Sequence, residues 1–406
     1  MDENYFNKST YWLQAWLALR SGNQQQTLDA VNHYLESLLE NELINEQFLL
    51  KLWDENKAKG ENPLPVHSPI LPPALTGLPE NVSRLPNDPP IFNNTMPQIN
   101  NTTDELVLLH LSDFHINNQD EATRYISQLK SDLLNELKIK QLDYLILSGD
   151  IGNYATTGEY QAAAFFVESL IKQFSISREK IIITAGNHDV SYDLSKEEGD
   201  KKKFRHFNEA FYQPITQKSY PLDYNEQAIL HIDQENKLLF LSLNSAWEID
   251  HYFEKRSSIH SVALALALDE ILEGDYQNWL KIAVWHHPVT GDEKMNDEFL
   301  QQLVTNGFKI CMHGHIHEAK DELFKYDSNR GIRIIAAGTF GAPAKEQTTG
   351  IPLQYNLLTW NKNEACITVQ TRRKEKPEGA WKADARWGDS NSPTASYKIE
   401  LAKKEN

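Results

Sequence analysis

The chain has little cysteine and no long apolar run, and both absences narrow its class. Its two cysteines among 406 residues, Cys311 and Cys366, are too few for a disulfide framework. No uncharged stretch approaches the roughly 18 residues that a membrane span requires. The acidic N-terminus is not followed by the apolar segment of a signal peptide. We therefore expect a cytoplasmic protein that does not enter a membrane.

Positive charge is also scarce, since 40 basic and 57 acidic side chains give a net charge of -17. That charge repels polyanions, so nucleic acid is a disfavoured but still open partner. The basic runs 201–203 and 372–374 are more typical of a solvated face than of a phosphate track. The sequence contains no G-x-x-x-x-G-K-[ST] motif, so nucleotide binding through a phosphate-cradling loop has no support.

The first hundred residues differ in composition from the rest. Apolar residues at helical spacing predict a small helical region over residues 1–60. It is either a packed bundle or a module for a protein partner or for self-association. Ten of the 17 prolines lie in residues 61–104, which predicts an extended linker or an arm against a folded surface.

From residue 105 onward, apolar runs alternate with helical periodicity. This alternation indicates an α/β domain with a largely parallel sheet covered by helices. Strands are predicted at 106–111, 144–147, 181–184, 228–232, 237–243, 282–285, 309–312 and 332–336. Helices are predicted near 120–137, 159–174 and 261–272, and a terminal hairpin at 354–359 and 365–371. The charged, aromatic-bearing stretch 191–225 interrupts the pattern and is interpreted as an insertion near the functional site.

Side chains that can bind metal follow five of these apolar runs. The five patches are Asp113-Phe114-His115, Gly149-Asp150, Gly186-Asn187-His188-Asp189, His286-His287-Pro288 and His313-Gly314-His315-Ile316-His317. Each alone has an ordinary explanation as a turn, a cap or a buried histidine. Because ligands in α/β sheets collect at the carboxyl ends of strands, five patches at five strand ends indicate one site.

The chemistry of these patches points to a pair of metal ions. They combine carboxylate, carboxamide and imidazole groups without thiolate, which suits Mn, Fe, Zn or Ni better than structural zinc. Seven ligands can hold two divalent ions when one carboxylate bridges them. Two ions about 4 Å apart clamp a phosphoryl group and lower the pKa of a bound water. The expected reaction is hydrolysis of a phosphate ester by a metal-bound hydroxide.

Over residues 105 to 340 the five patches resemble the five-block signature of calcineurin-like metallophosphoesterases, a family that includes class III cyclic nucleotide phosphodiesterases. The resemblance implies a four-layer αββα sandwich with a dinuclear metal centre at one edge. The metallophosphoesterase domain would span 105–406, with the insertion near 191–225 and the hairpin as a C-terminal extension. The helical N-terminal region lies outside the family's usual core.

The resemblance also implies a role for each site residue. The first ion would be held by Asp113, His115 and His317. The second would be held by Asn187, His286 and His315, with Asp150 bridging. Substrate would be bound by Asn187 and His188. His188 would also protonate the leaving oxygen, since an alkoxide leaves poorly without a proton.

Several assignments have alternatives. His287 could replace His286, although the family spacing to the proline favours His286. His313 is extra and either supports a ligand or is packed; packing is favoured. Asp189 is expected to buttress its loop rather than bind metal. The segments 191–225 and 246–256 could form a cap over the site, and aromatic packing is the alternative role.

The leading functional prediction is a phosphoesterase acting on a small phosphodiester such as a cyclic nucleotide. A phosphomonoester substrate stays open. A nuclease of the same fold would need a basic groove that the sequence does not show. A non-catalytic scaffold is disfavoured because no ligand of the signature is missing.

Overall fold

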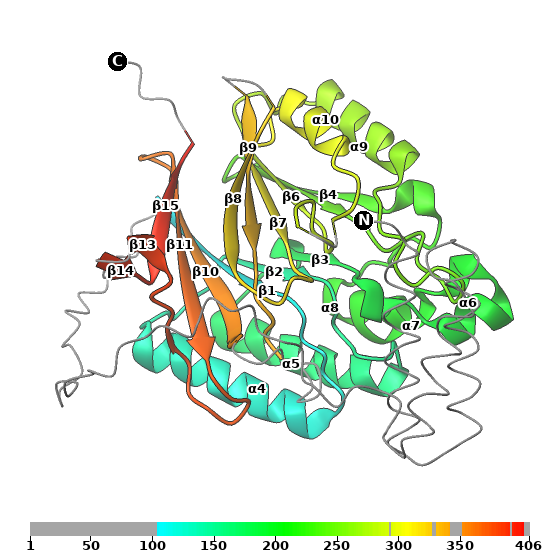
Figure 1. The fold of residues 1–406 in the computed structure, drawn as a ribbon, viewed down its shortest axis with the longest axis horizontal. Helices are drawn as coiled ribbons and strands as arrows, with labels where there is room; N and C mark the ends of the chain where they lie inside the picture. Colours follow the sequence, from blue (N-terminus) through cyan, green and yellow to red (C-terminus); the bar gives the residue numbers. More distant parts are fainter. Residues whose placement is uncertain (1–103, 292–293, 327–329, 342–350, 390–391, 402–406) are drawn as a thin grey trace, which may run out of the picture. The chain divides into compact units, whose positions relative to one another are not determined.

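The computed structural model of the chain describes residues 104–401 except 292–293, 327–329, 342–350 and 390–391 (Figure 1). The predicted helical region 1–60 and nearly all of the predicted linker 61–104 lie outside these residues. Within the described part of the chain, no helix is long and apolar enough to cross a membrane.

The first sheet combines the beginning and the end of the described chain. Its strands, in order, are β12 (Lys382–Ala383), β11 (Cys366–Lys374), β10 (Leu353–Asn361), β1 (Glu105–Leu111), β2 (Tyr144–Ser148) and β3 (Ile181–Thr184), and β15 (Ser396–Glu400) also pairs with β11. β1, β2 and β3 are parallel. β10 and β11 form the predicted hairpin, and β10 pairs antiparallel with β1. The C-terminal extension therefore completes this sheet.

The second sheet is formed by the middle of the chain. Its strands, in order, are β4 (Ala228–Asp233), β5 (Leu238–Leu243), β6 (Leu280–Val284), β7 (Ile310–His313), β9 (Gly331–Ala336) and β8 (Lys320–Lys325). β5, β6, β7 and β9 are parallel, and antiparallel strands close both edges. The sequence analysis missed β8 because its charged residues hide the strand; charged residues are typical of exposed edges. A separate two-stranded sheet joins β13 (Trp387–Asp389) to β14 (Ser392–Thr394).

Helices flank both sheets (Figure 1). The longer ones are α4 (Gln119–Ser131), α5 (Thr157–Phe174) and α9 (Ser261–Glu273). Short ones are α6 (Tyr192–Glu198), α7 (Arg205–Phe207), α8 (Gln213–Thr216) and α10 (Phe299–Thr305). π-helical turns are η2 (Asp132–Glu136) and η6 (Asn208–Tyr212), and 3-10 turns are η3 (Arg178–Lys180), η4 (Asn187–Asp189), η5 (Asp200–Lys202) and η7 (Tyr224–Glu226).

Alternate residues of each strand face different cores, as the pleat requires. In β1, Leu109 and Leu111 pack with α4 and α5, whereas Leu108 faces the second sheet. In β5, Leu241 packs against α9 and α10, whereas Phe240 faces the first sheet. The layers are therefore helix, sheet, sheet, helix, which confirms the predicted αββα sandwich. The strand pattern alone indicated one largely parallel sheet; two mixed sheets are found, because periodicity does not specify which strands pair.

The insertion 191–225 is part of the core rather than a separate cap. Phe204, Phe207 and Phe211 are fully buried and belong to the core of the first sheet, where the rings of Phe207 and Phe211 lie about 6 Å from that of Tyr160. For these side chains the aromatic-packing alternative is the one observed.

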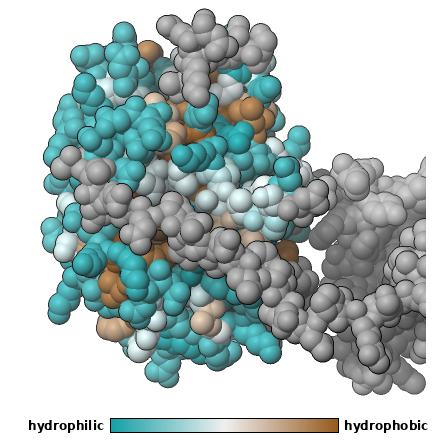
Figure 2. Space-filling view, turned by 90° about the vertical axis from the view of Figure 1, so that its left-hand side faces the viewer, coloured by the Kyte–Doolittle hydropathy of each residue, from teal (hydrophilic) through white to brown (hydrophobic). Residues whose placement is uncertain are grey.

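The face drawn in Figure 2 is largely hydrophilic, with hydrophobic residues in separate patches.

Candidate metal centre

The five motif loops meet at the carboxyl edge of the two sheets. Asp113 follows β1, Asp150 follows β2 and Asn187 follows β3. From the second sheet, His286 follows β6 and His315 follows β7. Because the strands within each set are parallel, the loops of each sheet start at one edge. The contact between His286 and Asp150 shows that these two edges lie together.

Two side-chain hydrogen bonds fix one sheet against the other at this edge. The hydroxyl of Thr184 in β3 donates to the carbonyl of Leu243 (2.7 Å), and the hydroxyl of Ser242 in β5 donates to the carbonyl of Ile183 (2.7 Å). All four groups are buried. The ligand loops of the two sheets are therefore held at a fixed separation.

Five of the seven predicted ligands have left-handed backbone conformations. Their φ values are 52° for Asp113, 45° for His115, 53° for Asp150, 67° for His315 and 56° for His317. Residues other than glycine rarely adopt such angles, and strained conformations cluster at functional sites. The placement of these side chains, rather than local backbone preference, therefore determines the conformation of the loops.

Glycines in the motifs allow the loops to touch. A Cβ atom at Gly314 would overlap the hydroxyl of Ser112, and one at Gly186 would overlap the carboxylate of Asp150. Both glycines are therefore required for close approach between loops from different strands.

One cluster of candidate ligands contains Asp150, Asn187, His286 and His315. Nε2 of His286 lies 3.1 Å from Oδ2 of Asp150 and 3.1 Å from Oδ1 of Asn187. Nδ1 of His315 lies 3.0 Å from the same Asn187 oxygen and 3.3 Å from Nε2 of His286. Nδ1 of His286 donates to the carbonyl of Ser148 (2.7 Å), so in the neutral ring Nε2 carries the lone pair that faces this cluster.

The second cluster contains Asp113, His115 and His317, whose ligand atoms lie within 4.8 Å of one another. Oδ1 of Asp113 lies 3.3 Å from Nε2 of His317. His115 is 1% exposed, and neither of its ring nitrogens has a hydrogen-bond partner. A buried imidazole without partners is unfavourable unless a ligand satisfies it, and a divalent cation among these oxygen and nitrogen donors would do so.

Asp150 lies between the two clusters. It has a carboxylate oxygen within 4.8 Å of ring nitrogens of His115 and His188. It also has a carboxylate oxygen within 4.8 Å of a ring nitrogen of His286 and a carboxylate oxygen of Asp113. Burial opposes its ionisation, but His286 and His188 hold the pKa of Asp150 well below its usual value. Burial also opposes protonation of His286, yet the charge of Asp150 raises the pKa of His286 to about 9.

His188 is held beside the clusters by its backbone and its ring. Its backbone N–H donates to Oδ1 of Asp150 (2.8 Å), and its Nδ1 donates to the carbonyl of Asn153 (2.9 Å). Its ring meets that of His115 edge to face at 4.7 Å. In the neutral ring the proton is therefore on Nδ1.

Asp189 holds two motif loops together, as expected. Its carboxylate accepts hydrogen bonds from the backbone N–H groups of Gly186 (2.9 Å), Ile151 (3.1 Å) and Gly152 (3.3 Å). The hydroxyl of Tyr160 donates to it as well (3.2 Å). The loop after β2 and the loop after β3 are thus joined through one buried side chain.

The two remaining histidines of the motifs have other partners. Nδ1 of His287 bonds to the hydroxyl of Ser245 (2.8 Å), so it is His286 that the structure places against Asp150. His313 is buried, and its ring lies parallel to that of Trp285 (6.4 Å between centroids, 5° between planes), as expected for a packed residue.

The sequence analysis missed two buried residues that support the ligands. Ser245 follows β5 by two residues, so the rule that found the ligands at strand ends would also have found it. His110 lies within β1, where its Nε2 bonds to the hydroxyl of Ser148 (2.9 Å). The sequence did show His110 as a polar residue within the otherwise apolar run of β1, and this could have indicated a buried histidine with a hydrogen-bonding role.

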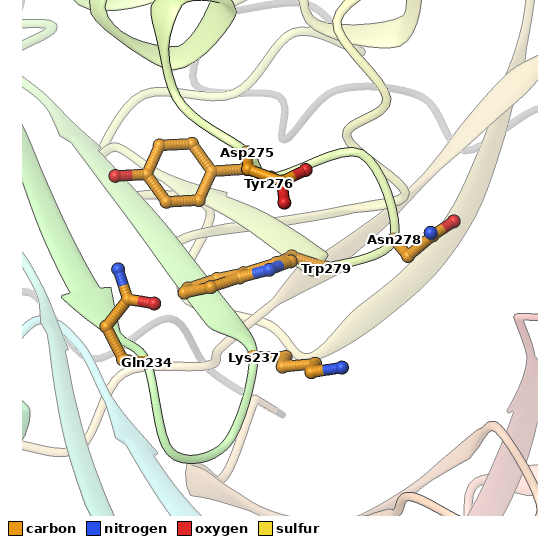
Figure 3. A pocket seen from close by; sticks show the side chains of 6 residues that line it. All are labelled: Gln234, Lys237, Asp275, Tyr276, Asn278 and Trp279. Carbon is orange, nitrogen blue, oxygen red and sulfur yellow. The ribbon is translucent and has the colours of Figure 1, made fainter.

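A cavity of about 330 Å³ lies elsewhere, lined by Gln234, Lys237, Asp275, Tyr276, Asn278 and Trp279 (Figure 3). Lys237 precedes β5 and Trp279 precedes β6, so the cavity is at the opposite end of these strands from His286. Its lining includes no histidine and one carboxylate. The cavity is therefore not part of the candidate metal centre.

Sequence comparisons find relatives that match part of this chain. Over 243 residues the chain is 22% identical to a metallophosphoesterase-like protein of Bacillus subtilis strain 168, covering 52% of this chain and 48% of the relative. Over 105 residues it is 31% identical to a protein of Fibrobacter succinogenes named as a probable cyclic nucleotide phosphodiesterase, covering 25% of this chain and 38% of the relative. The matches thus span half or less of these relatives.

A structural match is the dimetal phosphatase from Danio rerio, with 9% identity, a TM-score of 0.44 and coverage of 73% of this chain and 99% of that one. The fold assignment rests on the two facing sheets and not on this similarity. The family model for calcineurin-like phosphoesterases matches residues 106–319, more than half of the chain and all five motif loops. The protein belongs to the calcineurin-like phosphoesterase family.

Proposed function

We propose that this protein is a metal-dependent phosphoesterase that hydrolyses a small phosphodiester, such as a cyclic nucleotide, at the candidate metal centre. The observation that carries the proposal is the convergence of buried donors from five strand ends, including His115 with both ring nitrogens unpartnered. The similarity to a protein named as a probable cyclic nucleotide phosphodiesterase supports a diester substrate. The catalytic domain would span residues 105–406. The protein would be cytoplasmic, and its residues 1–60 would bind a protein partner or a second copy of the chain.

The donor set fits two divalent ions of the Mn, Fe, Zn or Ni type, because it offers oxygen and imidazole nitrogen without thiolate. The first ion would be held by Asp113, His115 and His317. The second would be held by Asn187, His286 and His315, with Asp150 shared. When bound, such ions polarise phosphoryl oxygens and lower the pKa of water.

The residues around the ions supply orientation and a proton. Hydrolysis breaks the ester P–O bond, joins hydroxide from water to phosphorus and transfers one proton to the leaving oxygen. We assign that proton transfer to His188, whose backbone N–H bonds to the Asp150 carboxylate and whose Nδ1–H bonds to the Asn153 carbonyl. The protonated ring would give its proton to the leaving oxygen from Nε2. Asn187, with its side-chain oxygen between His286 and His315, would position the phosphate next to the second ion.

Two other functions are tested by the same experiment. A nuclease would act on a polyanion, which the net charge of -17 disfavours. A non-catalytic scaffold would bind metal without turnover.

The test is metal stoichiometry by elemental analysis after loading with Mn²⁺, combined with hydrolysis of bis(4-nitrophenyl) phosphate. A panel of cyclic nucleotides, linear dinucleotides and single-stranded DNA would identify the substrate class. We expect two ions per chain and turnover of a small diester. His286→Asn should lose one ion and at least about 100-fold in kcat, the order reported for removal of a single catalytic donor.

The matched control is His260→Asn, because His260 belongs to none of the ligand groups, its side chain caps α9, and asparagine is a good N-cap. It should keep both ions and full activity. Two bound ions without turnover on any substrate would favour the scaffold, and turnover confined to DNA would favour the nuclease.

A further inference from the structure

We infer that His287 is a further catalytic residue at this centre, whose Nε2–H donates a hydrogen bond to a phosphoryl oxygen next to the second ion. The inference rests on the proposed function and goes beyond its ligand set. His287 is the histidine of the His286-His287-Pro288 motif that does not contact Asp150 or Asn187.

The protonation of the ring follows from the hydrogen bonds of Ser245. Its hydroxyl oxygen accepts the backbone N–H groups of His286 (3.2 Å) and His287 (3.1 Å). A serine hydroxyl has two acceptor lone pairs and one proton. With both lone pairs engaged, the proton remains for the third neighbour, Nδ1 of His287, at 2.8 Å. Nδ1 is therefore an acceptor, and the proton of the neutral ring is on Nε2.

The ring is fixed beside the second cluster. Its centroid lies 4.7 Å from that of His315 and 5.0 Å from that of His286. One of its nitrogens lies within 4.8 Å of ring nitrogens of both neighbours. The residue is 4% exposed, and its carbonyl accepts the indole N–H of Trp285 (2.7 Å). Side chain and backbone are both anchored, so the ring has little freedom to turn.

These hydrogen bonds distinguish a donor from a third imidazole ligand. A metal ligand needs a lone pair on the nitrogen that faces the ion. Such a lone pair on Nε2 would require Ser245 to give up its donor bond to Nδ1. A neutral N–H held in a water-poor site is instead suited to stabilise charge that develops on a phosphoryl oxygen, because it needs no reorganisation during the reaction.

A pair of substitutions tests the position of the donor. In His287→Gln the side-chain amide reaches the place of Nε2, whereas in His287→Asn it reaches only the place of Nδ1. With bis(4-nitrophenyl) phosphate and Mn²⁺, we expect His287→Asn to lower kcat by about 100- to 1,000-fold with little change in KM. We expect His287→Gln to retain kcat within about 10-fold of the wild type, because it still offers a donor. Both should bind two ions.

Ser245→Ala is the second test, because it keeps the ring and removes the group that sets its proton. Ser245 is a positioning residue, so this variant should bind two ions and show a kcat between those of the wild type and His287→Asn. Loss of an ion from His287→Asn, as expected of His286→Asn, would make His287 a ligand and overturn the inference. Wild-type kcat in His287→Asn would also overturn it and leave the proposed function intact, whereas an inactive wild type would overturn both.

Discussion

Gly314 shows at the scale of one residue how the loops of this centre depend on close contact. It separates His313 from His315, and its backbone N–H donates to the carbonyl of His286 (3.1 Å). The atoms opposite its α-carbon are the hydroxyl of Ser112 and, at 2.7 Å from an added Cβ, Oδ2 of Asp113. A side chain at this position would therefore push the β1 loop away from the β7 loop.

We expect Gly314→Ala to lower the free energy of unfolding by about 1–3 kcal/mol, the usual cost of overpacking a tight interior. It should also weaken metal binding, because Asp113 would move away from His317. Chemical denaturation and titration calorimetry with Mn²⁺ measure the two effects.

The control is Gly158→Ala, since a Cβ there meets no atom within 4 Å and the residue lies in the first turn of α5. This substitution should leave metal binding unchanged and raise stability by up to about 1 kcal/mol, because alanine favours helix. If the two variants behaved alike, the close approach at Gly314 would be unimportant.

At the scale of elements, a buried ion pair connects the end of α4 to the C-terminal hairpin. Arg372 of β11 donates from Nε to Oδ2 of Asp132 (2.9 Å) and from Nη2 to Oδ1, and the hydroxyl of Tyr355 in β10 donates to the same carboxylate. Arg372 and Asp132 are 1% and 3% exposed, and Lys374 is also buried, so the solvated face expected for residues 372–374 was wrong. The hairpin is thus joined to the helical layer by charge as well as by apolar packing.

We expect Asp132→Ala to lower the free energy of unfolding by about 3–5 kcal/mol, because it leaves the Arg372 guanidinium buried without its counter-charge. Urea denaturation measures the loss. The double variant Asp132→Leu/Arg372→Met removes both charges and should recover most of that stability. A double variant as unstable as the single one would mean that the pair itself, rather than the uncompensated charge, determines the result.

The Trp381 to Trp387 segment also belongs to this connection. The Trp381 ring stacks on that of Phe340 (5.3 Å, 19°) and meets that of Tyr355 (4.9 Å, 78°). Lys382–Ala383 forms β12 at the edge of the first sheet. The segment after the hairpin therefore adds both a strand and core side chains.

At the scale of the whole molecule, neutral histidines shielded from solvent link stability to pH. Burial lowers the pKa of His110 to about 3 and that of His313 to about 4, from an ordinary 6.5. Desolvation also lowers the pKa of the half-buried His231 to about 4. Between pH 6.5 and about 4 the unfolded chain binds protons that the folded chain excludes. The stability contributed by these groups is therefore fully present above pH 6.5 and is lost as the pH falls through this window.

We expect the free energy of unfolding, measured with a chelator present, to fall by up to about 1.4 kcal/mol per pH unit for each such histidine as the pH drops from 6.5 to 4.5. Guanidinium denaturation at four pH values measures the slope. His231 lies in β4 and is not one of the candidate ligands. The variant His231→Gln should therefore lower the slope of unfolding free energy against pH by the contribution of one titrating group. An unchanged slope in this variant would contradict the assignment for His231.

Much of the domain could be predicted because its signals are local. β3 was predicted with the same bounds as observed, since Ile181 to Thr184 is an apolar run between polar residues. Most other predicted strands and helices differ from the observed ones by one or two residues at their ends. β8 and the short strands β12, β13 and β14 were missed because they show neither a continuous apolar run nor a clear period. α10 and β15 were missed although they have a helical and an alternating pattern, because these patterns extend over only seven and five residues.

The sequence by itself determined which side chains gather at the centre. Asp113, Asp150 and His286 each follow a strand, and the carboxyl ends of parallel strands share one edge. Only the tertiary structure decided which strands pair within each sheet and where the protons lie on the rings. Strand pairing and hydrogen-bond partners such as Ser245 are long-range contacts, and no local pattern in the chain encodes them.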